Sequence, residues 1–312
     1  MGELLFAIIK TARPRQWLKN LALFTTILIT GHIFEGRAFT STILGFIAFC
    51  LLSSSNYIFN DVMDVNRDRK HPFKKFRPVP SGALPMPIAL GVSILFVILG
   101  LLIGYQLGSV FFLLSVLFIV LEYTYTLFFK HITVIDILAI TAAYFLRVYA
   151  GEAATGYHIS VWLALAALSL ALFLAIGKRR AELTLIQGYK GTATETRASL
   201  SHYSERLLDT YTAMFANSTF ITYAFYTFLE RPIQQGFFFR GYTDFAPELP
   251  GRKWMMITIP FVLYGIMRYM MLIYEGKGES PEKVLTSDMP LLTTVILWSV
   301  SVFLVIYGIG GY

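Results

Sequence analysis

The sequence contains little cysteine and little charge, and both shortages limit what kind of protein it can be. Cys50 is the only cysteine among 312 residues, which excludes an intramolecular disulfide and a thiolate metal site. Only 14% of the residues are charged, whereas 56% are hydrophobic. Because soluble domains carry about 25% charged residues, this composition indicates an integral membrane protein.

Repeats and linkers are also missing from the chain. No fixed-period repeat or low-complexity segment divides it, so we expect residues 1–312 to form a single transmembrane domain. Residues 1–17 carry a short apolar run followed by basic residues, without a small-residue cleavage site. This pattern predicts an interfacial helix and no signal peptide.

Long apolar segments recur along the whole chain. Each is close to the ~20 residues that a helix needs to cross the hydrocarbon core of a bilayer. The nine segments are 18–34, 40–59, 86–104, 110–129, 134–150, 160–177, 208–229, 254–273 and 291–309. The sequence therefore predicts an all-α integral membrane protein with a single bundle of nine transmembrane helices.

Positive charges are divided unevenly between the two expected faces of this bundle. With the N-terminus in the cytoplasm, nineteen Lys and Arg residues fall on the cytoplasmic side and five on the other, and Arg147 and Arg268 lie in or near helices. Such an excess marks the cytoplasmic face. We therefore expect a multi-pass protein of the cell membrane with a cytoplasmic N-terminus. The loops at 61–85 and 178–206 would be cytoplasmic active-site loops.

The densest polar pattern follows the second apolar segment. Asn56, Asn60, Asp61, Asp64 and Asp68 would form one polar stripe on a helix. A lone carboxylate at a helix end is usually only solvated, but several on one face repel one another and favour a cation between them. Because carboxylate and carboxamide oxygens suit Mg²⁺, we expect a Mg²⁺-diphosphate site. Asn60, Asp64 and Asp68 would be metal ligands, and Asp61, Asp64 and Asp68 catalytic residues.

A basic run comes directly after the stripe. Lys74 and Arg77 form a Lys-x-x-Arg pattern, which by itself is equally well explained by the charge bias of cytoplasmic loops. Beside a metal-bound diphosphate, these cations could neutralise its remaining charge. Lys19 follows Arg15 by four residues at the entrance of the first segment. It is an even choice between a membrane anchor and a phosphate ligand.

Further polar residues surround the turn between the fourth and fifth segments. Tyr125, Lys130 and Asp136 span this turn, and Arg147 lies about three helical turns deeper in the fifth segment. An arginine in hydrocarbon costs about 3 kcal/mol or more, so Arg147 should meet an anion. That anion is either a substrate phosphate or, as the structural alternative, Glu122 or Asp136.

A second basic cluster follows the sixth segment. It consists of Lys178, Arg179, Arg180 and Glu182, with Arg197 and Tyr203 downstream. Lys178 and Glu182 could simply form an i, i+4 ion pair. The alternative that we favour gives the cluster a role in binding substrate.

These motifs resemble those of the UbiA superfamily of intramembrane prenyltransferases. The resemblance covers nearly the whole chain and centres on the NDxxDxxxD pattern of Asn60, Asp61, Asp64 and Asp68. Within the superfamily, the chain looks most like the decaprenyl-phosphate phosphoribosyltransferase branch. The motifs that carry this finer resemblance are RPRQWLKN at 13–20, HPFKKFRP at 71–78, the residues from Tyr125 to Asp136, FLRVYAG at 145–151 and GKRRAEL at 177–183.

The resemblance implies an enzyme that transfers 5-phosphoribose from phosphoribosyl diphosphate to a polyprenyl phosphate, with Mg²⁺, at the cytoplasmic membrane face. Ordinary members carry a second aspartate-rich motif after helix six, where this sequence has KRRAE at 178–182. Three cations and one glutamate suit a donor with an extra phosphate better than a second metal. The partners would be the donor, the lipid acceptor and the membrane, with a homo-oligomer possible and no nucleic acid. The expected substrate-binding residues are Lys19, Asn56, Lys74, Arg77, Tyr125, Lys130, Asp136, Arg147, Lys178, Arg179 and Glu182.

Two other functions stay open on the sequence alone. A prenyl-diphosphate transferase acting on an aromatic or glycerol-phosphate acceptor would share the acidic stripe, but it should also need the missing second acidic motif. A cation-coupled transporter could place carboxylates and Arg147 inside a bundle. Transporter sites usually lie near the membrane midplane at broken helices, whereas the charges here gather at one interface.

Overall fold

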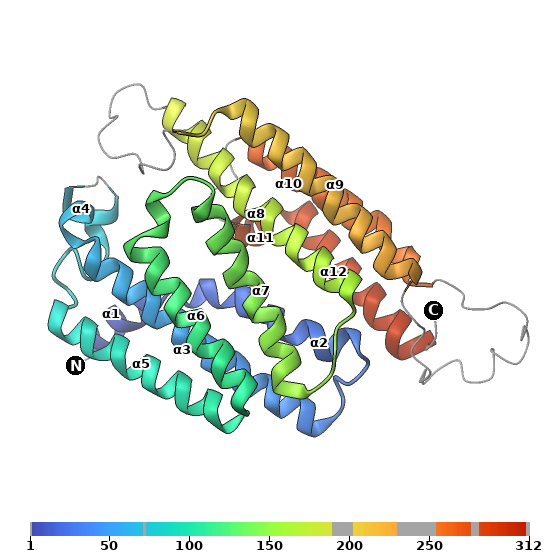
Figure 1. The fold of residues 1–312 in the computed structure, drawn as a ribbon. Helices are drawn as coiled ribbons and strands as arrows, with labels where there is room; N and C mark the ends of the chain where they lie inside the picture. Colours follow the sequence, from blue (N-terminus) through green and yellow to red (C-terminus); the bar gives the residue numbers. More distant parts are fainter. Residues whose placement is uncertain (1, 71–72, 189–201, 230–253, 276–280, 310–312) are drawn as a thin grey trace, which may run out of the picture. The chain divides into compact units, whose positions relative to one another are not determined.

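The computed structural model describes residues 2–70, 73–188, 202–229, 254–275 and 281–309. Every regular element in these ranges is a helix, so the all-α prediction is confirmed (Figure 1). The chain forms two compact units. The first contains residues 1–25, 36–130 and 146–156, and the second contains residues 26–35, 131–145 and 157–312. A single domain over 1–312 stays a prediction.

Most of the described helices belong to one unit or the other. The first unit contains α1 (Gly2–Ala12), the 3₁₀ helix η1 (Pro14–Leu23), α3 (Gly36–Met63), α4 (Val65–Lys70), the 3₁₀ turn η2 (Lys74–Phe76), α5 (Met86–Gln106) and α6 (Ser109–Leu127). The second contains α8 (Val161–Gly188), α9 (Glu205–Leu229), η6 (Trp254–Thr258), α10 (Ile259–Tyr274), α11 (Pro281–Ser287), α12 (Met289–Phe303) and the π-helix η7 (Leu304–Ile309). Three elements have residues in both units: α2 (Phe24–Ile29), η3 (Phe129–His131) and α7 (Ile135–Thr155).

Seven helices within the described ranges are long and apolar enough to cross a membrane. They are Gly36–Met63, Met86–Gln106, Ser109–Leu127, Ile135–Thr155, Val161–Thr184, Trp254–Tyr274 and Met289–Gly308. The two remaining predicted segments differ. Residues 18–34 include part of η1 and the six-residue α2, and residues 208–229 lie in α9, which is rich in Thr and Tyr. The count of nine spans therefore stays a prediction.

Local sequence signals explain several of the helix ends. Gly108 has φ 117°, a conformation that glycine adopts without steric cost, and it reverses the chain between α5 and α6. Proline stands in the first turn of both α5 and α12, where its missing N–H costs nothing. Asp288 caps α12 by accepting a hydrogen bond from the Leu291 N–H at 2.9 Å.

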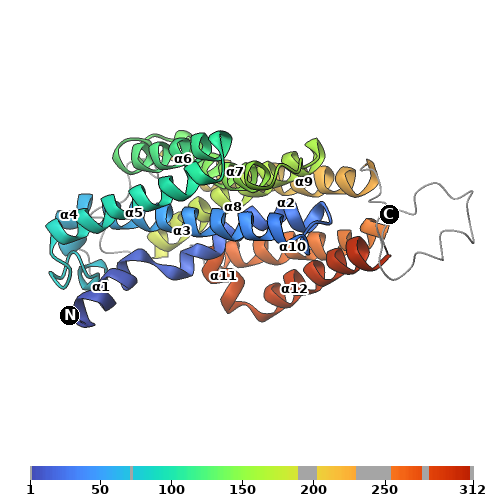
Figure 2. The ribbon, with the colours of Figure 1, turned by 90° about the horizontal axis from the view of Figure 1, so that it is seen from below.

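The first unit is built around α3. This helix contacts α1, η1, α5 and α6, and Figure 2 shows α3 and α5 side by side. Glycine permits the close approach, because a methyl group at Gly100 would lie 2.9 Å from the Leu52 side chain. Small residues at such contacts are typical of membrane helices. The N-terminal helix α1 exposes Leu5, Phe6 and Ile9, and its placement at the membrane interface stays a prediction.

The second unit is organised around α8, α9 and α10. α8 runs beside α9, and α10 contacts α8, α9 and α12 (Figure 2). Ser169 and Ser218 join α8 to α9 through their hydroxyl groups, 3.0 Å apart. Arg268 of α10 contacts Asp288 with 2.6 Å between Nη2 and Oδ2. Arg268, a charged residue in an otherwise apolar segment, is thus paired with the carboxylate that caps α12.

Gly151 lies where α7 and η1 approach each other closely. An added Cβ there would lie 2.2 Å from the backbone oxygen of Leu23. No heavy atom fits at that distance, so Gly151 allows the end of α7 to lie directly against η1.

We expect Gly151→Ala to lower the thermal midpoint of the purified protein by several degrees. The methyl group must push η1 away, and overpacking of this kind costs about 1–3 kcal/mol. Gly91→Ala on α5 is the matched control, because an added Cβ there meets nothing within 4 Å. Alanine at such a site normally stabilises a helix by about 1 kcal/mol. Equal midpoints for the two variants would contradict the close-approach role.

Candidate functional site

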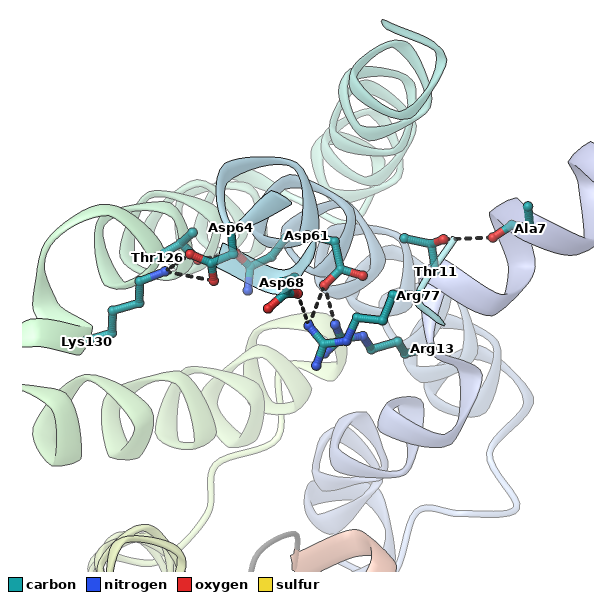
Figure 3. Close-up of polar contacts among 10 residues, drawn as sticks. Ala7, Thr11, Arg13, Asp61, Asp64, Asp68, Arg77, Thr126 and Lys130 are labelled. Carbon is teal, nitrogen blue, oxygen red and sulfur yellow. Dashed lines mark hydrogen bonds and ion pairs between the residues drawn. The ribbon is translucent and has the colours of Figure 1, made fainter. Parts of the chain in front are cut away.

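The acidic stripe is divided between two helices. α3 ends at Met63, Asp64 forms the turn, and α4 begins at Val65. This corrects the prediction of one continuous helix. Hydrogen bonds of helical spacing nevertheless continue across the turn, from the Asp64 N–H to the Asn60 oxygen at 2.9 Å and from the Asp68 N–H to the Asp64 oxygen at 2.8 Å. Asp61, Asp64 and Asp68 therefore stay close together, as predicted (Figure 3).

Two arginines from distant segments converge on Asp61. Its side chain is only 2% exposed, and its Oδ1 lies 2.5 Å from Nη2 of Arg13 and 3.2 Å from Nη1 of Arg77. The same Arg77 nitrogen lies 2.7 Å from Oδ2 of Asp68 (Figure 3). A buried carboxylate needs such partners, because an unpaired charge out of water costs several kcal/mol. Arg77 thus links the end of α3 to α4.

Asp64 forms an ion pair with a different cationic side chain. Lys130, which follows α6, places its Nζ 2.9 Å and 3.1 Å from the two Asp64 oxygens. Its side chain is only 7% exposed. Lys130 thus pairs with Asp64, whereas Arg77 lies between Asp68 and Asp61 (Figure 3). Lys130 was predicted to bind substrate, and its contact here is with a predicted metal ligand.

A buried polar network lies deeper along α3. Asn56 donates to Oε2 of Glu122 at 2.7 Å. Arg147 lies 3.7 Å from Oε1 of the same glutamate, and its Nε donates to Asn20 at 2.8 Å. Its guanidinium also sits over the Phe118 ring, 4.6 Å from the centroid. The anion that Arg147 meets is thus Glu122, one of the two structural alternatives. A substrate role for Arg147 and Asn56 stays a prediction.

The second unit contains another buried charge network. Arg179 and Asp136 are both fully buried, with 3.3 Å between Nε and Oδ2. Arg179 Nη1 also lies 2.5 Å from Oε2 of Glu182. Tyr203 donates from its hydroxyl to Oδ1 of Asp136 at 2.8 Å. The structure therefore brings Asp136, Arg179 and Glu182 together, as three predicted substrate-binding residues.

Arg180 has a structural role that the sequence interpretation missed. Its Nε lies 2.6 Å from Oδ1 of Asp209, and its Nη2 lies 3.2 Å from Oε2 of Glu205. These contacts tie α8 to α9. A role of Arg180 in binding an extra phosphate stays a prediction, and its contacts here are with two carboxylates.

The remaining predicted residues lie on elements of both units. Lys19 is in η1, Lys74 in η2, Tyr125 in α6 and Lys178 in α8, and each is partly buried. His71 of the HPFKKFRP motif and Arg197 fall outside the described residues.

Arg13 is a site residue that the sequence interpretation did not select. It adopts a left-handed conformation with φ 53° directly before Pro14, a combination that backbone sterics disfavour. Its guanidinium contacts Asp61 and lies over the Tyr57 ring at 5.1 Å. The sequence feature that could have identified Arg13 is its position as the first residue of the RPRQWLKN motif.

The donor set fits a partial magnesium site. In the described ranges, no group of three or more His, Cys, Asp or Glu side chains is arranged to hold a metal. Mg²⁺ is usually held by one or two carboxylates together with substrate phosphates. Asp64, Asp68 and the carboxamide of Asn60 are hard oxygen donors of that kind. They fit a site that substrate oxygens complete.

We expect Arg147→Ala to destabilise the protein by about 3 kcal/mol or more, because it leaves the Glu122 charge buried without its guanidinium. Glu122→Gln should recover part of this loss in the double variant. Thermal unfolding of both single variants and the double variant measures the coupling. Arg37→Ala at the exposed start of α3 is the control.

Arg147→Lys separates this structural pairing from substrate binding. Lysine keeps the charge but lacks the guanidinium fork that binds phosphate in two places. Strong coupling to Glu122 in stability, with unchanged donor affinity in Arg147→Lys, would remove Arg147 from the substrate site.

Comparison with known proteins gives the family. The model of the UbiA prenyltransferase family matches residues 21–292. The chain is 32% identical over 305 residues to a decaprenyl-phosphate phosphoribosyltransferase of Corynebacterium glutamicum, covering 96% of this chain and 86% of that protein. It is 29% identical over 310 residues to the enzyme of the same name from Mycolicibacterium smegmatis, covering 98% and 94%.

Solved structures show the same fold. The UbiA homolog from Archaeoglobus fulgidus bound to GPP and Mg²⁺ matches with a TM-score of 0.69 at 19% identity, over 96% of this chain and 99% of that one. The seven apolar helices and these matches together indicate a multi-pass membrane protein. The chain belongs to the UbiA prenyltransferase family.

Proposed function

We propose that this protein transfers 5-phosphoribose from phosphoribosyl diphosphate to a polyprenyl phosphate and releases diphosphate. The observation that carries the proposal is the similarity to the Corynebacterium glutamicum decaprenyl-phosphate phosphoribosyltransferase, which extends over 96% of the chain. The sequence KRRAE at 178–182, in place of a second aspartate-rich motif, supports a phosphorylated sugar donor.

Asn60, Asp64 and Asp68 would hold Mg²⁺ beside the donor diphosphate. When bound there, the metal would supply Lewis-acid stabilisation to the leaving group. The carboxylates now contact Arg77 and Lys130. The same carboxylates would hold the metal, and Arg77 and Lys130 beside them would bind phosphate oxygens. A carboxylate that already lies against each cation lowers the cost of burying that charge before substrate binds.

The acceptor needs no strong general base. An oxygen of the lipid phosphate forms the new bond to the anomeric carbon, and the bond from that carbon to diphosphate breaks. Diphosphate leaves with the electron pair. Because the acceptor is already an anion, no hydroxyl has to be deprotonated, and we nominate no base. Positioning and electrostatic stabilisation would supply most of the rate.

The cations would divide the phosphate groups between them. We assign the departing diphosphate to Lys19, Lys74 and Arg77, and we add Arg13 because it shares Asp61 with Arg77. The 5-phosphate and the lipid phosphate are assigned to Lys130, Arg147, Lys178 and Arg179. Among these, Lys130, Arg147 and Arg179 each contact a carboxylate, which holds the cation in place before substrate binds.

The membrane topology is part of the same proposal. We place the N-terminus and the loops after α3 and α8 on the cytoplasmic face of the cell membrane, because the Lys and Arg excess lies on that side. Nine spans result if residues 18–34 and α9 also cross the bilayer. The lipid tail of the acceptor would then enter from the bilayer along the apolar helix faces.

Transfer of label tests the function directly. Purified protein in nanodiscs should convert ribose-labelled phosphoribosyl diphosphate and decaprenyl phosphate into a lipid-extractable product, and only with divalent metal. Binding of the donor should also be measurable by calorimetry. Tight binding of geranyl diphosphate without any response to the ribosyl donor would favour the prenyl-diphosphate transferase.

Loss of a metal ligand tests the role of the acidic residues. We expect Asp64→Asn and Asp68→Asn to lower turnover by about 100-fold or more, since disturbing even the outer partners of metal ligands costs 10–100-fold. Glu3→Gln on the exposed face of α1 removes a carboxylate that is not among the proposed metal ligands and serves as the control. Near wild-type turnover in both aspartate variants would contradict the assignment of these residues as metal ligands.

A further inference from the structure

Tyr203 lies in the core of the second unit, two residues before α9. Its side chain packs in a cluster with Ile137, Ala175, Ile176 and Leu208. The ring alone would fit an ordinary core position. The hydroxyl group, however, makes two hydrogen bonds to a single short segment at the start of α7.

The first hydrogen bond is with the backbone of Val134, which is strained. Val134 has φ 70°, a left-handed conformation that is a genuine outlier for a β-branched residue. Its N–H donates to the Tyr203 hydroxyl at 2.6 Å. Such strain persists only where the surroundings hold it, and it clusters at functional sites. Tyr203 therefore holds the backbone that leads into α7.

The second hydrogen bond is with the buried carboxylate of Asp136. The Tyr203 hydroxyl donates to Oδ1 of Asp136 at 2.8 Å, and the same oxygen accepts from the Ile137 N–H at 2.9 Å. Burial raises the pKa of Tyr203, so its hydroxyl stays protonated and keeps donating at neutral pH. Two donors thus fix the direction of a carboxylate whose other oxygen faces Arg179.

The orientation of Arg179 depends on this carboxylate. Asp136 lies beside its Nε and Glu182 beside its Nη1, so two points of the planar guanidinium are set. The Tyr203 hydroxyl and the Ile137 N–H both bind Oδ1 of Asp136, while Oδ2 of the same carboxylate lies beside Nε of Arg179.

We propose that Tyr203 is a positioning residue for substrate phosphate, acting through Asp136 on the guanidinium plane of Arg179. The inference rests on the proposed function, which assigns a substrate phosphate to Arg179. In this role Tyr203 contacts no substrate, and the buried carboxylate of Asp136 transmits its effect to Arg179. Loss of the hydroxyl should then weaken donor binding even where the fold is kept.

Tyr203→Phe is the direct test, because phenylalanine keeps the ring in its cluster. We expect the donor KM to rise about 10-fold with a smaller change in kcat, and Arg179→Lys to raise it by a similar factor. The double variant should be no worse than Arg179→Lys alone, since both changes act through the same guanidinium. Tyr211→Phe removes a hydroxyl from the same cluster and should leave the donor KM unchanged.

Val134→Gly separates positioning from simple structural support. Glycine adopts φ 70° freely, so it should recover stability that Tyr203→Phe loses at Val134. We expect this double variant to regain its thermal midpoint but not its donor KM. Recovery of both would overturn the inference, as would a wild-type donor KM in Tyr203→Phe.

The proposed function can fail separately from this inference. If the wild-type protein neither binds phosphoribosyl diphosphate nor transfers its label, the assigned substrate is wrong. If the wild-type protein does both and Tyr203→Phe behaves like Tyr211→Phe, the positioning role alone is wrong.

Discussion

The need to neutralise buried carboxylates organises the first unit. The side chain of Asp61 is almost fully buried, and an unpaired charge there would cost several kcal/mol. Arg13 and Arg77 meet this need from segments that are 48 and 16 residues away in the chain. Each pair fixes a connecting segment against the end of α3. The charges that would bind the donor are therefore the same charges that hold the site together.

Membrane helices have no hydrophobic drive to associate inside lipid, so close contacts and polar pairs carry more of the packing. α7 illustrates both. Gly151 brings its end against the backbone of Leu23, and Arg147 reaches Glu122 and Asn20 from the same helix. At its start, Asp136 meets Arg179. One helix thus supplies polar contacts in each unit.

Much of this architecture could be predicted from the sequence. The run at 40–59 lies inside α3, and Arg147 has a carboxylate partner, as the cost of an arginine in hydrocarbon requires. Other features could not be predicted. Asp64 divides the acidic stripe, and Arg180 pairs with Asp209 and Glu205. Both outcomes depend on partners from segments distant in the chain.

Periodicity and composition are local properties, so the helical class, the apolar segments and the residue types of the site can be predicted from the chain alone. The sequence also carries the motifs that mark the UbiA family. The fold is needed to establish which cation faces which carboxylate, that Arg13 belongs to the site, and that Tyr203 bonds both Val134 and Asp136. These outcomes follow from distances between remote segments, and the energy of an ion pair or hydrogen bond falls steeply with such distances.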